Sequence, residues 1–150
     1  MKNEKSSQNK PRVIFVDDEP FYSRQIINEL ESDFNVEYFE YVNEAIPRIR
    51  SVCEPFILIL DVMMPPPELE LIAETENGHL TGFWMLSQIA KILRDTGSPV
   101  FCLTNIDLIE AKHHFHNFAI TDILIEIEHK GAVTPESMLK RLKNLAAKHL

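Results

Sequence analysis

The sequence has few cysteines, no long apolar run and an excess of acidic over basic residues. Cys53 and Cys102 form no Cys-x-x-Cys pair and have no nearby His spacing, which excludes a disulfide framework or structural zinc site and suits a reducing compartment. No run approaches the roughly 18 apolar residues of a bilayer span, and the N-terminus MKNEKSSQNK lacks a signal-peptide core. A net charge of -8 disfavours nucleic acid and anionic membrane surfaces as partners. We therefore expect a soluble cytoplasmic protein.

Length and composition predict one folded domain. The chain has 150 residues, of which 45% are hydrophobic, an ordinary share for a globular protein and too high for disorder. Residues 1–11 are polar and without periodicity, so we expect a flexible tail followed by a single domain over residues 12–150. An additional DNA-binding or catalytic domain would have almost no room.

Hydrophobic periodicity predicts strands and helices in strict alternation. The predicted strands cover residues 12–17, 36–42, 56–60, 100–103 and 123–127, and the predicted helices cover 21–30, 44–52, 83–93, 108–118 and 138–145. Helices of this length between apolar strands indicate right-handed parallel crossovers. The expected fold is therefore an α/β domain with one open, doubly wound parallel sheet and helices on both faces.

Acidic side chains directly follow two of the predicted strands. Asp17 and Asp18 come after the first strand, with Glu19 next to them, and Asp61 follows the third strand. The carboxyl ends of neighbouring parallel strands meet at one edge of the sheet, where such folds bind their ligands. Because converging carboxylates repel one another and Mg²⁺ prefers oxygen ligands, the pattern predicts a magnesium site. Taken singly, Asp17 and Asp18 also suit helix N-caps.

Thr104 ends the fourth predicted strand and brings a hydroxyl group to the same edge. A threonine at this position also suits the N-cap of the helix that begins near Asp107. The sequence leaves both interpretations open.

Together these residues resemble the receiver domain of bacterial two-component response regulators. The resemblance covers about residues 12 to 148 and rests on a late lysine and on the segments Asp17-Asp18-Glu19, Leu60-Asp61-Val62-Met63-Met64-Pro65 and Leu103-Thr104. It implies a five-stranded sheet of flavodoxin-like order 2-1-3-4-5. It also implies a stand-alone phospho-acceptor that takes part in its own phosphotransfer and is not an enzyme acting on a separate substrate.

The resemblance also implies a role for each residue of the set. Asp61 would be the nucleophile that accepts a phosphoryl group from a histidine of a sensor kinase or phosphotransfer protein. Asp18 would ligate Mg²⁺ directly, Asp17 mostly through water, and Asp61 and the Met63 backbone carbonyl would complete the ligands. Thr104 would hydrogen-bond one phosphoryl oxygen and a lysine would pair with another. The added charge would then shift the region after the fourth strand, which an unknown downstream protein reads.

The identity of the phosphate-pairing lysine depends on where the fifth strand ends. The usual strand length puts Glu126 at that position, where a carboxylate would repel a phosphoryl group. A longer strand, in which the alternation of apolar residues continues past Glu126, puts Lys130 at its end, with Gly131 supplying the turn. Thr134 and Pro135 then begin the last helix as its N-cap and first residue. We therefore predict Lys130 as the phosphate partner, with Glu126 and an inactive site as the alternative.

Residues 62–81 form an unusually long loop after the third strand. A connection between a strand and a helix normally has about 2–6 residues. This segment contains three consecutive prolines, four glutamates and no Lys or Arg. We consider two hypotheses: a rim beside the phosphorylation pocket that restricts access or contacts the partner, and an inert surface excursion.

Two further functions remain alternatives on sequence grounds. Receivers usually carry an aromatic residue on the fifth strand, where this chain has aliphatic residues, and a small residue after the threonine, where this chain has Asn105. These differences concern the signalling step more than the phosphorylation chemistry, and a degenerate receiver that acts as a phosphorylation-independent interaction module is the second hypothesis. A magnesium phosphohydrolase with Asp61 as nucleophile is a third hypothesis, but it would need a second acid where Met63 stands.

Overall fold

The computed structural model describes residues 10–118, 120 and 122–150. Most of the predicted tail, residues 1–9, lies outside the described residues. Strands and α-helices alternate along the described chain, with two short 3₁₀ helices between them. In chain order these elements are β1 (Arg12–Val16), α1 (Pro20–Leu30), β2 (Asn35–Phe39), α2 (Val42–Arg50), β3 (Ile57–Asp61), η1 (Leu69–Leu71), α3 (Thr81–Thr96), β4 (Val100–Thr104), α4 (Leu108–Asn117), β5 (Ile125–His129), η2 (Lys130–Ala132) and α5 (Pro135–His149).

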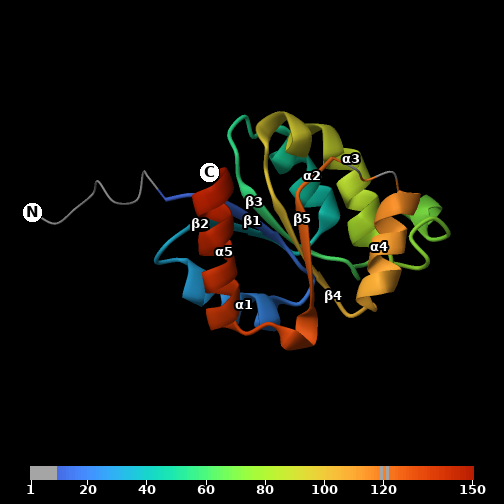
Figure 1. Ribbon diagram of the computed structural model, residues 1–150. Helices are drawn as coiled ribbons and strands as arrows, with labels where there is room; N and C mark the ends of the chain where they lie inside the picture. The colour runs from blue at the N-terminus through green and yellow to red at the C-terminus, as the bar shows by residue number, and fades with distance from the viewer. Residues whose placement is uncertain (1–9, 119, 121) are drawn as a thin grey trace, which may run out of the picture.

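The strands form one parallel sheet in the order β2-β1-β3-β4-β5 (Figure 1), which confirms the predicted fold class. β3 lies at the centre, and every residue of this strand is buried. A strand covered on both faces has no solvent-facing positions, which explains its continuous apolar sequence.

Helices cover both faces of the sheet (Figure 1). On one face α2, α3 and α4 pack against residues such as Leu58, Leu60 and Val100. On the other face α1 and α5 pack against the side chains of the alternate positions, among them Phe15 and Ile59. Side chains of successive strand residues point to opposite faces, so each strand contributes to both apolar layers.

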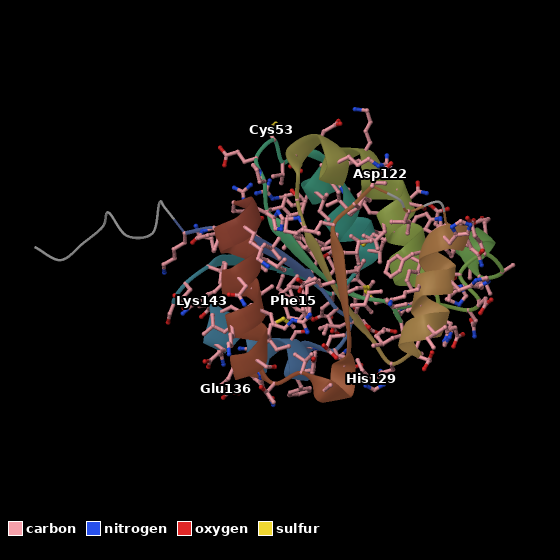
Figure 2. All side chains as sticks on the ribbon, viewed as in Figure 1. Phe15, Cys53, Asp122, His129, Glu136 and Lys143 are labelled. Carbon is pink, nitrogen blue, oxygen red and sulfur yellow. The ribbon has the colours of Figure 1, made fainter. Side chains whose placement is uncertain are left out.

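The fifth strand begins two residues later than predicted and extends past residue 127, as the prediction of Lys130 at its end requires. β5 runs from Ile125 to His129 and not over residues 123–127. Its residues pair in register with β4, so that Val100 lies opposite Ile125 and Thr104 opposite His129. His129 thus lies at one end of β5 and Asp122 near the other (Figure 2). The shift puts Lys130 directly after the carboxyl end of the sheet.

Both edge strands carry glutamates that are paired with arginines. On β2, the Glu37 carboxylate accepts a hydrogen bond of 2.7 Å from Arg48 Nε of α2 and lies 3.3 Å from Arg12 Nε of β1. On β5, Glu126 and Glu128 both pair with Arg141 of α5. These ion pairs connect each edge strand to a neighbouring element.

The long loop after β3 is folded back on itself. Thr75 is buried within it; its hydroxyl donates to Leu71 O at 2.7 Å and accepts from Gly78 N at 3.3 Å. Gly78 has φ of +92°, and a Cβ there would lie 2.6 Å from Met64 O, so the close return to the start of the loop requires glycine. Met64 N donates to Gly78 O and closes the loop.

Candidate functional site

The structure brings the predicted acidic residues together at the carboxyl edge of the sheet. Asp17 and Asp18 follow β1 and Asp61 ends β3, and these strands are neighbours with Val16 opposite Leu60. One carboxylate oxygen from each of Asp17, Asp18, Glu19 and Asp61 lies within 4.8 Å of the others. Asp17 and Asp61 are buried, and Glu19 is exposed. The register of adjacent strands therefore creates the cluster.

Lys130 reaches into this acidic cluster from η2. Its Nζ atom lies 2.9 Å from Asp17 Oδ2, 3.2 Å from Glu19 Oε1 and 3.4 Å from Asp61 Oδ2. The side chain is only 6% exposed. The turn that positions it is held by His129, whose Nδ1 accepts a hydrogen bond from Gly131 N at 3.2 Å. The predicted late lysine is thus close to the Asp61 carboxylate, while its role toward a phosphoryl group stays a prediction.

The alternative position for the lysine, Glu126, lies away from this cluster. Glu126 is in the middle of β5 opposite Phe101 and is paired with Arg141 at 3.1 Å. Arg141 also lies over the Phe101 ring, with 4.7 Å between the guanidinium carbon and the ring centroid. The Glu126 carboxylate is therefore paired with α5, where it shares Arg141 with Glu128.

Burial governs the electrostatics of the two inner carboxylates. Burial and the neighbouring Asp17 raise the pKa of Asp61 to about 8, although Lys130 acts in the opposite direction. Burial also raises the pKa of Asp17, against the hydrogen bond from Lys130. Burial alone would lower the pKa of Lys130, but the Asp61 and Asp17 carboxylates outweigh it and hold this pKa above its ordinary value. The positive charge of one ammonium does not balance the negative charges of the carboxylates around it. A bound divalent cation would reduce the repulsion that remains.

Two tyrosines that the sequence analysis did not single out support the cluster. Tyr38 of β2 donates a hydrogen bond of 2.6 Å to the backbone carbonyl of Asp17. The Tyr22 ring of α1 lies 4.4 Å from Lys130 Nζ, measured to the ring centroid. Burial raises the pKa of Tyr22 to about 12, so it is a neutral phenol at physiological pH. Nothing in the local sequence marks Tyr22 as a neighbour of Lys130.

The N-cap interpretations of the polar residues are wrong. The N-cap of α4 is Asp107, whose Oδ1 accepts from Ile109 N and Glu110 N. Thr104 is buried three residues earlier, and its hydroxyl accepts from Ile106 N at 2.8 Å, which leaves the hydroxyl proton free to donate. The N-cap of α1 is Glu19, which makes no side-chain capping bond. Asp17, Asp18 and Thr104 are therefore not used to cap these helices.

Gly82 lies directly against the backbone that carries Asp61. A Cβ at Gly82 would be 2.6 Å from Asp61 O and 2.7 Å from Val62 Cα, and Gly82 N donates to Val62 O at 2.8 Å. Only glycine permits this contact between the start of α3 and the end of β3. Met63 follows on the loop, and its amide donates to Asp61 Oδ1 at 3.3 Å.

The long loop borders the acidic cluster. A hollow of about 600 Å³ is lined by Asp18 of the cluster and by loop residues that include Met63, Pro65, Glu76 and His79. The loop is therefore adjacent to the predicted phosphorylation site.

The donor set suits a magnesium ion. The cluster offers only carboxylate oxygens, without His or Cys, and hard divalent cations prefer such ligands. Asp17, Asp18 and Asp61 could hold such an ion, and the contribution of the Met63 backbone carbonyl stays a prediction. The described residues contain no helix long and apolar enough to cross a membrane.

Comparison with known proteins identifies the fold. No protein-family model and no curated protein matches the chain. Solved receiver domains do match it. The BeF3-activated receiver domain of DrrB has a TM-score of 0.65 at 17% identity, covering 92% of this chain and 98% of that domain. A CheY-like receiver domain protein from Methanospirillum hungatei has a TM-score of 0.67 at 19% identity, covering 94% and 97%. The Salmonella typhimurium response regulator RcsB has a TM-score of 0.67 at 22% identity, covering 93% of this chain and 61% of RcsB. The chain has the fold of response-regulator receiver domains.

Proposed function

We propose that this domain is a phospho-acceptor that receives a phosphoryl group on Asp61 and signals through protein contact. The observation that carries the proposal is the position of the buried Asp61 carboxylate among Asp17, Asp18 and Lys130. The receiver fold supports the same role. The donor would be a phosphohistidine of a sensor kinase or of a phosphotransfer protein.

In the transfer step, a carboxylate oxygen of Asp61 forms a bond to phosphorus as the phosphorus–nitrogen bond of phosphohistidine breaks. The imidazole nitrogen keeps the electron pair of that bond. Lys130, 3.4 Å from Asp61 Oδ2, pairs with a phosphoryl oxygen, and the Thr104 hydroxyl donates to another. Asp17, Asp18 and Asp61 would hold a magnesium ion, whose charge would neutralise the phosphoryl oxygens and favour the ionised form of Asp61.

The signal would arise from the new charge at the end of β3. Thr104 ends β4, and α4 begins four residues later at Leu108. When Thr104 and Lys130 turn toward the phosphoryl group, the β4–α4 connection changes between two arrangements that a downstream protein distinguishes.

Labelling with acetyl phosphate tests the proposal. Intact-mass spectrometry should show one phosphoryl group on the wild type with Mg²⁺, and none on Asp61→Asn or in EDTA. Asp95→Asn is the matched control, because Asp95 is an exposed aspartate of α3 paired with Lys91. Equal labelling of Asp61→Asn would contradict the assignment of Asp61. A wild type that takes no label from acetyl phosphate and does not bind beryllofluoride would favour the phosphorylation-independent module.

A further inference from the structure

The ammonium of Lys130 has two kinds of partner, carboxylate oxygens and an aromatic ring. Carboxylate oxygens of Asp17, Glu19 and Asp61 lie within 3.4 Å of Nζ, and the ring of Tyr22 lies 4.4 Å away. Fixing the flexible Lys130 side chain in one position costs conformational entropy. The contacts that surround its ammonium must together offset that cost.

The other two carboxylates compete with Asp61 for the ammonium. The shortest contact is with Asp17, and Glu19, whose side chain is 58% exposed, also contacts the ammonium. Asp61 makes the longest of the three contacts. A further partner that leaves the N–H donors free would favour the position of the ammonium beside Asp61.

Tyr22 supplies that partner from the protein interior. Its ring packs with the apolar layer under α1 and α5, and its hydroxyl is buried. The negative face of an aromatic ring attracts an ammonium without competing for its hydrogen-bond donors, which stay available to carboxylate or phosphoryl oxygens. We propose that Tyr22 is a positioning residue that holds the Lys130 ammonium over the phosphorylation site. This inference rests on the proposed function.

The hydroxyl group of Tyr22 is not required for the contact between its ring and the Lys130 ammonium. Among the described residues it has no hydrogen-bond partner. An unpartnered buried hydroxyl does not stabilise the folded state, so Tyr22→Phe should keep the ring contact at no cost. Tyr22→Leu removes the ring and keeps an apolar side chain.

Affinity for beryllofluoride with Mg²⁺, measured by NMR titration, tests the role. Loss of one partly desolvated cation–π contact predicts about threefold to tenfold weaker binding for Tyr22→Leu. Tyr22→Phe should bind as the wild type does, and so should the matched control Tyr41→Leu, which removes an exposed tyrosine of the α2 N-terminus. In a Lys130→Ala background, Tyr22→Leu should weaken binding no further. Equal weakening in that background, or in Tyr22→Phe, would overturn the proposal.

A second measurement keeps this inference separate from the proposed function. The ring current of Tyr22 should move the ε-methylene proton resonances of Lys130 upfield in the protein without phosphodonor. The shift should persist in Tyr22→Phe and vanish in Tyr22→Leu, and its absence in the wild type would refute the positioning role. If the shift is present but the wild type binds no beryllofluoride, the proposed phospho-acceptor function fails and the Tyr22–Lys130 contact stands.

Discussion

Replacing Asp61 with Asn should stabilise the metal-free protein, and the stabilisation should grow as the pH rises. Burial and the adjacent Asp17 raise the pKa of Asp61 from 3.8 to about 8. Between these values the folded protein holds a proton on Asp61 that the unfolded chain has released. The folded state then binds more protons at this site, so the contribution of Asp61 to the free energy of unfolding falls from about pH 4 to about pH 8 and is constant beyond. Asn carries no such proton.

The size of the effect follows from the shift. Each pKa unit is worth about 1.4 kcal/mol, so a rise from 3.8 to about 8 gives an upper limit of roughly 6 kcal/mol above pH 8. The uncharged Asn side chain loses the electrostatic attraction to Lys130, which reduces the gain in stability. Lys130 keeps Asp17 and Glu19 as ion-pair partners. We therefore expect Asp61→Asn to be more stable by about 2–4 kcal/mol at pH 8 and by less than about 1 kcal/mol at pH 5.

Urea unfolding in EDTA, followed by circular dichroism at several pH values, measures this difference. Glu54→Gln is the control, because Glu54 is an exposed carboxylate before β3, at the opposite end of the strands from Asp61. Excess Mg²⁺ should narrow the gap, since the ion binds the folded wild type more tightly than Asp61→Asn. A wild type as stable as Asp61→Asn at pH 8, or a gap that does not change with pH, would refute the electrostatic argument.

Other expected outcomes concern the residues around Asp61. Gly82→Ala should cost about 2 kcal/mol or more in urea unfolding and slow labelling of Asp61, since its Cβ would lie 2.6 Å from Asp61 O; unchanged stability would contradict the close contact. Lys130→Ala should still be labelled by acetyl phosphate but lose the NMR shift changes that phosphorylation causes in α4, and retained changes would exclude Lys130 as the phosphate partner. Replacing residues 67–77 with a short link should alter the phosphoryl lifetime or partner affinity without unfolding the domain; no change in either would favour an inert excursion.

The sequence predicted the alternation of strands and helices well because the sheet is covered on both faces. A short, continuous apolar run such as residues 56–60 is typical of a strand that is covered on both faces. The order of the strands came from the resemblance to receiver domains. The clustering of Asp17, Asp18 and Asp61 was predictable for the same reason, since each follows a strand directly and neighbouring strands end together.

Prediction was weaker where tertiary contacts decide the outcome. The fifth strand was placed two residues early because Ile123 and Leu124 look like strand residues, whereas the register with β4 selects Ile125–His129. The contact between Tyr22 and Lys130 joins residues far apart in sequence, and no local pattern announces it. Likewise, nothing in the sequence around Gly82 indicates that the backbone at the end of β3 packs directly against it.

The arginine-paired glutamates of the edge strands have a consequence for self-association. An edge strand exposes unpaired backbone groups that invite pairing with another chain, and natural sheets discourage this with charged side chains. A second copy that docked on β2 or β5 would lie beside Glu37, or beside Glu126 and Glu128, each already held by an arginine. Pairing there would desolvate these charges without offering them new partners. We therefore expect the edge strands β2 and β5 to resist pairing with a strand of another chain. Contacts with other proteins should then be made through helices and loops.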